Sequence, residues 1–313
     1  MREGRGETMV GALSGRPIFI PDRDAPPMPS LAPPGVTRDG EPAPGFEGLA
    51  AGAESNPDVR SFRRKFGLLL PATNTSMEHE LWSILRGNGG EGALDGVGLH
   101  TANVVTPRPR FGNADELEEY RRQFLGGLES AVDQALMAEP HYLIMGMSLE
   151  HIVAGIDQVR SPVEEVEARS GLSVAAWHDA AAAALARFSA KRIGLLSPFD
   201  PAGNRNATSM FEDLGFTVVS AVGFSCELAL HIAHIPDWAK EKAILELLAT
   251  PENRLDAVVQ CGTNMSLIQV SERLEPRLGI PVIGINAALL WYALRENGIS
   301  DAVAGAGRLL REF

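Results

Sequence analysis

The chain has 313 residues, of which 45% are hydrophobic and 22% are charged, and its formal net charge is −12. This composition is typical of a globular protein with one large or two modest cores. No apolar run approaches the length of a membrane span, and an acidic chain lacks the concentrated basic surface that binds nucleic acid. We therefore expect neither partner, whereas an anionic small-molecule substrate is compatible because a few arginines or helix N-termini can bind it.

The cysteine content points to a reducing compartment. Cys226 and Cys261 are the two cysteines of the chain, too few for a disulfide framework. The first residues show no charged-then-apolar secretory pattern. Both features favour a cytoplasmic protein.

Residues 1–60 differ in composition from the rest of the chain. They hold ten of the 21 prolines and show no sustained periodicity. Such a segment buries too little apolar surface to offset its ordering entropy, so we expect an extended or disordered extension. The alternative is an ordered arm, anchored by the apolar residues 16–21, that covers a partner subunit in a homo-oligomer.

From Phe66 onward, short apolar runs alternate with helical stretches. Residues 114–138 and 237–250 show apolar spacing near 3.6 with acidic residues in the first turn, which predicts helices. Strands that alternate with helices indicate a parallel sheet covered on both faces, so the fold class is α/β. We place a first half at residues 61–180 and a second at 181–313, whose last helix returns to the first half.

Two pairs of segments are similar to each other. "FGLLLPATNTSM" (66–77) resembles "RIGLLSPFDPAGNRN" (192–206), and "YLIMGMSLEH" (142–151) corresponds to "VVQCGTNMSL" (258–267). This similarity suggests two copies of one α/β unit facing each other. Because ligands bind outside the carboxyl ends of parallel strands, we expect all four turns to line a single cleft between the halves.

Cys261 is the main candidate for chemistry. It ends a strand-like run just before a predicted helix, where free backbone N–H groups and the positive helix end favour a thiolate. Gly262 allows a ligand to approach the backbone, and Thr263 or Asn264 can cap the helix or donate hydrogen bonds. The alternative is a buried cysteine with a purely structural role.

The equivalent turn of the first half contains Gly146, Met147 and Ser148. Their backbone N–H groups and one hydroxyl can form an oxyanion hole for a carboxylate or enolate. Asn74 and Thr75 lie before another predicted helix and are further candidates, although an ordinary helix N-cap would explain them equally.

The fourth turn carries Ser197, Phe199, Asn204 and Asn206, and we expect one asparagine to face the cleft and the other to cap its helix. His151 as an acid or base and Arg108 and Arg110 as a carboxylate clamp are weaker candidates. Cys226 is expected to be a packing residue. We predict no metal site, because His231 and His234 lack further ligands, and no cofactor, because nucleotide-binding and serine-nucleophile motifs are missing.

Together these motifs resemble the aspartate/glutamate racemase superfamily, in particular its arylmalonate decarboxylase and maleate cis–trans isomerase branch. "FGLLLPATNTSME" is similar to the first strand and Asn-Thr turn of maleate isomerases. "LIMGMSLEH" is similar to the dioxyanion loop of arylmalonate decarboxylase, and "QCGTN" to its Cys-Gly turn. "RLGIPVIGINAALLWYALRENGI" matches the closing strand and helix, so that the resemblance covers residues 64–300.

The resemblance implies a cofactor-independent enzyme that acts on a small carboxylic acid through an enolate-like intermediate. Racemases and maleate isomerases of the superfamily use two cysteines, and Gly146 occupies the position of the first. Decarboxylases keep only the second, which corresponds to Cys261. Phe199 stands where the branch has a tyrosine, and Met147 where the decarboxylase has a threonine.

One thiol suffices for decarboxylation, so we expect a decarboxylase of arylmalonate decarboxylase type. A β-elimination lyase of dimethylsulfoniopropionate-lyase type, a maleate-isomerase-like or racemase-like isomerase and a non-catalytic ligand-binding member are the alternatives. Cys261 would transfer the proton, and the substrate would contact Asn74, Thr75, Gly146, Met147, Ser148, Phe199, Asn204, Gly262, Thr263 and Asn264.

Overall fold

The computed structural model describes four short N-terminal strands and residues 58–87, 94–105, 114–147 and 155–313. The N-terminal strands form two antiparallel pairs, β1 (Thr8–Gly11) with β2 (Pro17–Ile20) and β3 (Thr37–Arg38) with β4 (Glu41–Pro42). Most of the N-terminal extension lies outside the described residues. The two expectations for this extension therefore stay predictions.

The first half contains a parallel sheet with the strand order β6-β5-β7-β8. Its two central strands, β5 and β7, are almost fully buried, as expected for strands covered on both faces. The strands are β5 (Arg64–Pro71), β6 (Val97–Val104), β7 (Tyr142–Met145) and β8 (Val174–Ala175).

The second half repeats this arrangement with the order β10-β9-β11-β12, again all parallel. Each sheet therefore places its second, first, third and fourth strand in the same order, which confirms the predicted α/β fold of two similar halves. The crevice in such a sheet lies between the first and third strands, where the order reverses. The strands are β9 (Arg192–Ser197), β10 (Thr217–Gly223), β11 (Ala257–Gln260) and β12 (Val282–Gly284).

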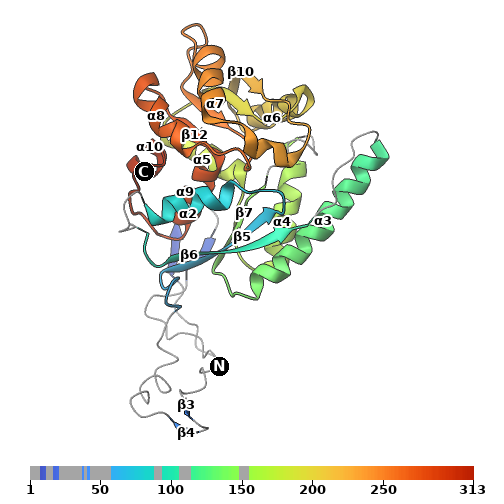
Figure 1. The fold of residues 1–313 in the computed structure, drawn as a ribbon, viewed down its shortest axis with the longest axis vertical. Coiled ribbons are helices and arrows are strands. Elements are labelled where there is room, and N and C mark those ends of the chain that lie inside the picture. The colour runs from blue at the N-terminus through green and yellow to red at the C-terminus, as the bar shows by residue number, and fades with distance from the viewer. Residues whose placement is uncertain are drawn as a thin grey trace.

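Helix α9 (Ile285–Glu296) lies in the middle of the molecule, between the two sheets (Figure 1). Its residues are buried on all sides, which follows from a sequence that is apolar around the whole helix. It packs against α2 (Met77–Arg86), α5 (Trp177–Arg187) and strands β7 and β8, so it joins the second half to the first. The domain boundary predicted at residue 180 falls inside α5.

The remaining helices flank the sheets (Figure 1). The two helices predicted from periodicity are present: one is α3, and the other continues from α7 into a π-helical turn, η2. Among the described helices, none combines the length and apolarity needed to cross a membrane. Their bounds are α3 (Ala114–Leu136), α4 (Ile156–Ser170), α6 (Pro201–Asp213), η1 (Ala229–His234), α7 (Asp237–Ala243), η2 (Ile244–Leu248), α8 (Ile268–Leu278) and α10 (Arg308–Glu312).

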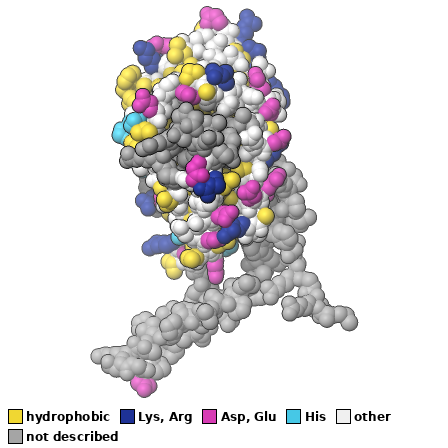
Figure 2. Space-filling model, turned by 90° about the vertical axis from the view of Figure 1, so that its right-hand side faces the viewer, with side chains coloured by type: hydrophobic (Ala, Val, Ile, Leu, Met, Phe, Trp, Pro, Cys, Tyr) yellow, Lys and Arg dark blue, Asp and Glu magenta, His cyan; other side chains and the backbone are white. Residues whose placement is uncertain are grey.

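The described surface shows no segregation of basic charge on the face drawn in Figure 2, where lysines and arginines are scattered among acidic side chains. This agrees with the overall negative charge of the chain. It gives no support to a nucleic-acid-binding surface on this face.

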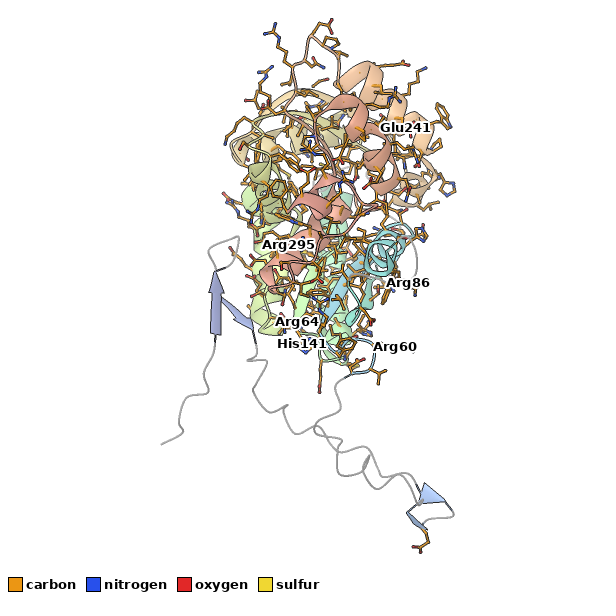
Figure 3. All side chains as sticks on the ribbon, turned by 90° about the vertical axis from the view of Figure 1, so that its left-hand side faces the viewer. Arg60, Arg64, Arg86, His141, Glu241 and Arg295 are labelled. Carbon is orange, nitrogen blue, oxygen red and sulfur yellow. The ribbon has the colours of Figure 1, made fainter. Side chains whose placement is uncertain are left out.

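A histidine at the end of the first half far from the second half makes stability sensitive to pH. His141 lies beside Arg64 (Figure 3), and its Nδ1 accepts a hydrogen bond from the Lys65 N–H at 2.9 Å. Burial and the charges of Arg64 and Lys65 lower the pKa of His141 below its ordinary value of 6.5. Unfolded His141 therefore binds a proton at higher pH than folded His141, so its contribution to stability is complete above pH 6.5 and is lost as the pH falls.

We expect the free energy of unfolding of the wild type to fall between pH 7.5 and pH 5 by more than that of His141→Gln. Urea titrations at both pH values measure this difference. His79→Gln, on the exposed side of α2, is the control and should keep the wild-type pH dependence. Identical slopes for wild type and His141→Gln would contradict the assignment.

Candidate active site

Three of the four predicted turns meet at one point between the halves, where hydrogen bonds link them. Asn74, after β5, donates from Nδ2 to the Thr263 hydroxyl at 3.0 Å. That hydroxyl in turn donates to the backbone carbonyl of Gly146, after β7, at 3.0 Å. Thr263 belongs to the turn after β11, so one buried hydroxyl ties both central strands of the first sheet to the Cys261 turn of the second.

A second link runs parallel to the first. Asn264 accepts a hydrogen bond from the Thr75 N–H at 3.0 Å through Oδ1. Its Nδ2 donates to the carbonyls of Thr73 at 3.3 Å and Ala229 at 3.0 Å. The predicted substrate contacts Asn74, Thr75, Thr263 and Asn264 therefore lie together, and in this structure they bind one another.

Asn74 combines the two roles that the sequence left open. Its Oδ1 accepts from the N–H groups of Ser76 at 3.1 Å and Met77 at 3.0 Å, which holds the first turn of α2. The formal N-cap residue, Ser76, makes no side-chain cap hydrogen bond. Because the amide oxygen holds the helix, the amide nitrogen is fixed in its direction toward the second half.

Cys261 is fully buried at the end of β11. Its N–H donates to the Leu196 carbonyl of β9 at 2.9 Å. The Gln260 side chain braces the turn from behind, because its Nε2 donates to the carbonyls of Cys261 and, at 2.7 Å, of Gly262. The thiol therefore has a defined position in the crevice between β9 and β11.

The expected helix next to Cys261 does not stabilise its thiolate in the way that the sequence suggested. Helix α8 begins only at Ile268, after an intervening turn. The N–H groups of Leu267 and Ile268 donate to Glu80 Oε1 at 2.7 and 2.9 Å, so the positive end of α8 is already occupied by a carboxylate. Any stabilisation of negative charge near Cys261 must come from the turn itself.

That turn offers backbone donors. Gly262, Thr263 and Asn264 are buried, and within the described part of the chain their three N–H groups donate to no acceptor. Buried N–H groups in folded proteins nearly always have a partner, so consecutive donors beside a thiol mark a place for an anionic ligand atom. Gly262 has φ +92°, and a β-carbon there would lie 2.6 Å from the Pro198 ring. Only glycine fits this position.

Gly146 differs from the expectation. Its N–H donates to the Leu69 carbonyl at 2.8 Å, so it is a strand donor and not part of an oxyanion hole. A β-carbon at this position would lie 2.7 Å from Met77 Sδ and 3.0 Å from the terminal carbons of Leu68 and Leu70. A thiol at position 146 would therefore require the core to move. Met147 is buried, and Ser148 lies outside the described residues.

The fourth turn supports the site mainly through Pro198, whose ring lies against Gly262. Phe199 is buried in the core and its N–H donates to the Ser197 hydroxyl at 3.0 Å. Ser197 also donates to Asn204 Oδ1 at 2.5 Å. Asn204 and Asn206 lie inside α6, whose cap is the Asp200 side chain, so the expectation that an asparagine caps this helix is wrong.

Several weaker candidates receive no structural test. Arg108, Arg110 and His151 lie outside the described residues. His231 and His234 lie on η1 with their rings 6.4 Å apart. Among the described residues, no three histidine, cysteine, aspartate or glutamate side chains form a metal-binding group. Cys226 is partly buried, and burial raises the pKa of its thiol, which disfavours a nucleophilic role.

Sequence analysis missed two buried polar residues that support the Cys261 turn. Glu80 is 2% exposed, and Asn286 at the start of α9 is 1% exposed. The signal for Glu80 was available, because Met77, Leu81 and Ile84 define the apolar face of α2 and position 80 lies on it. A charged residue on the apolar face of a helix indicates a buried partner.

The hydroxyl of Thr263 is expected to contribute strongly to the joint between the halves. Thr263→Val leaves the Gly146 carbonyl without its donor and the Asn74 amide without its acceptor, which should cost about 1–3 kcal/mol of unfolding free energy. Urea denaturation measures this loss. The same exchange at the exposed Thr217 on β10 should change stability by less than about 0.5 kcal/mol, and equal losses at both positions would contradict the assignment.

Comparison with known sequences identifies a family. The sequence model described as arylmalonate decarboxylase matches residues 133–310, more than half of the chain. The maleate isomerase of Nocardia farcinica is 26% identical over 253 residues, which cover 80% of this chain and 96% of that protein.

Solved structures show the same fold. The maleate cis–trans isomerase of Nocardia farcinica with a covalently bound succinylcysteine intermediate has a TM-score of 0.68 at 21% identity, and the match covers 80% of this chain and 99% of that chain. An arylmalonate decarboxylase has a TM-score of 0.61 at 13% identity, covering 79% and 98%. The resemblance to the decarboxylase and isomerase branch of the racemase superfamily is thus confirmed, and this chain belongs to the arylmalonate decarboxylase family.

Proposed function

We propose that the protein is a cofactor-independent enzyme that converts a small carboxylate through an enolate-like intermediate, with Cys261 as its one reacting thiol. The observation that carries this proposal is the buried turn after Cys261, where three successive N–H groups have no acceptor among the described residues. Donors in this position are suited to an oxyanion, and removing one such donor typically costs about 2.7–4 kcal/mol in the barrier.

The first candidate reaction is cis–trans isomerisation of an unsaturated dicarboxylate of the maleate type. The relative that is 26% identical over nearly its full length is a maleate isomerase, so the comparisons support this reaction at least as well as the decarboxylation expected from the sequence. A structurally similar isomerase carries a succinyl group on a cysteine, which shows that a thiol in that protein forms a covalent bond to such a ligand.

A single thiol is sufficient for this reaction. The Cys261 thiolate adds to one alkene carbon, and the π electron pair moves onto the adjacent carboxylate as an enediolate, which the turn N–H groups bind. The former double bond is now a single bond and rotates. The enediolate electron pair then re-forms the double bond and expels the thiolate. No proton enters or leaves the carbon skeleton, so the crowded Gly146 position needs no second thiol.

The second candidate is decarboxylation of a malonate, which the family match and the missing thiol at Gly146 favour. The bond to one carboxylate breaks, carbon dioxide leaves, and the electron pair stays on the substrate as an enediolate. The Cys261 thiol then gives its proton to the carbon and regains one from water. This reaction also uses the thiol from one side only.

Nuclear magnetic resonance in D2O separates the two reactions. With maleate, the single-thiol mechanism predicts fumarate without deuterium on carbon. With phenylmalonate, decarboxylation predicts phenylacetate that carries one solvent deuterium. Conversion of neither compound at stoichiometric enzyme would contradict the proposed substrate classes, and deuterium in the fumarate would show that a second proton donor acts on the intermediate.

A further inference from the structure

A buried carboxylate lies directly behind the Cys261 turn. Glu80 comes from α2 of the first half and is 2% exposed, yet it contacts only elements that carry the turn of the second half through the hydrogen bonds it makes. Its Oε1 accepts from the N–H groups of Leu267 and Ile268 at the start of α8. Its Oε2 accepts from Asn286 Nδ2 at 2.8 Å.

Asn286 extends this contact to the turn itself. The same Nδ2 that donates to Glu80 also donates to the Thr263 carbonyl at 2.9 Å. The amide oxygen Oδ1 is buried and has no partner among the described residues. Both neighbours of Nδ2 are acceptors, so the amide is held in one orientation, and reversing it would place Oδ1 against a carboxylate and a carbonyl.

The opposite side of the turn is held by Lys240 of α7, which is 1% exposed. Its Nζ donates to the Ser266 carbonyl at 2.6 Å and the Ser266 hydroxyl at 3.1 Å, and pairs with Asp237 at 2.8 Å. Among the described residues, Lys240 is the charged group that acts on Glu80. The turn between Cys261 and α8 is therefore clamped between an acidic and a basic side chain.

Resting on the proposed function, we propose that Glu80 is a positioning residue: in its ionised form it fixes, through Asn286 and the start of α8, the turn that presents the three N–H groups beside Cys261. Protonation of Glu80 places a hydrogen on an oxygen that now accepts from a donor. At least one of the three hydrogen bonds is then lost, and the Thr263 carbonyl and its neighbouring N–H groups are no longer held in place.

This role predicts an acid limb in turnover at an unusual pH. Burial raises the pKa of Glu80 above its ordinary value of 4.5, against the opposing effect of its three donors and of Lys240. Turnover should therefore decline as the pH falls toward a value higher than that of an exposed glutamate, while the surface carboxylates are still ionised. In Glu80→Gln this limb should be absent.

The test measures kcat and KM between pH 4.5 and 8 with maleate and phenylmalonate for wild type, Glu80→Gln and Glu80→Asp. We expect about a 100-fold lower kcat for Glu80→Gln at pH 7.5, with a smaller change in KM, because a small misplacement of catalytic groups has effects of this size. The shorter Glu80→Asp should lose the contact to Asn286 and recover little. Glu78→Gln, on the same helix and partly exposed, is the matched control and should behave like wild type.

Amide hydrogen exchange read by mass spectrometry provides a measurement that needs no substrate. In the wild type, peptides covering residues 261–268 should lose protection below neutral pH, after correction for intrinsic exchange. In Glu80→Gln they should already be unprotected at pH 7.5. Equal protection and an unchanged acid limb in Glu80→Gln would overturn the role of Glu80. Undiminished turnover in Cys261→Ala would instead overturn the proposed function, so the two failures are distinguishable.

Discussion

Cys261→Ala is expected to lower turnover of the identified substrate by at least about 10³-fold. In either candidate reaction the thiol is the atom that bonds to the substrate or protonates it, and no second described thiol lies in the turn to replace it. Cys261→Ser should lose nearly as much, because a hydroxyl is a far weaker acid and nucleophile than a thiol. Steady-state kinetics on the variant proteins measures the loss.

Cys226→Ala is the matched control for this experiment. The chain has two cysteines, and burial raises the pKa of the Cys226 thiol, so its removal should leave turnover within about twofold of wild type. A large loss in Cys226→Ala together with an active Cys261→Ala would reverse the assignment. Thermal unfolding of both variants shows that a loss of turnover is not a loss of fold.

Gly262→Ala is expected to damage both stability and catalysis. The added β-carbon meets the Pro198 ring at 2.6 Å, and the residue must keep φ at +92°, which together should cost about 2–4 kcal/mol of unfolding free energy. Movement of the turn to relieve the clash misplaces the three N–H donors, so turnover should fall by about 10²-fold or more. Urea denaturation and kinetics measure the two effects.

Gly279→Ala separates backbone strain from the clash at the site. Gly279 ends α8 with φ +72°, and nothing lies within 4 Å of the position of its β-carbon. This variant should lose about 1 kcal/mol of stability and keep full turnover. If it lost as much turnover as Gly262→Ala, the effect at Gly262 would be general destabilisation and not a property of the site.

The fold could be predicted because its signals are local and repeated. Alternating apolar runs and helical stretches predict parallel sheets, and the two similar segment pairs correspond to the first and third strands of each half. The strand order places those strands next to each other, which explains why turns that are about 190 residues apart, at Asn74 and Thr263, form one hydrogen bond.

The chemistry of the site was less predictable because it depends on what occupies each polar group. The sequence places Cys261 before a helix, yet the positive end of α8 is taken by Glu80 from the other half. Gly146 similarly looked like an oxyanion donor, but its N–H completes the pairing with β5. Such long-range partners leave no local pattern, except for the position of Glu80 on the apolar face of α2.

The central claim, that the turn after Cys261 binds the substrate as an oxyanion, is tested most directly by a crystal structure of Cys261→Ala with maleate. The account predicts a carboxylate oxygen about 2.7–3.1 Å from at least two of the N–H groups of residues 262–264. The carbon skeleton should lie beside position 261. Maleate bound away from this turn, or these N–H groups donating to protein acceptors in the complex, would contradict it.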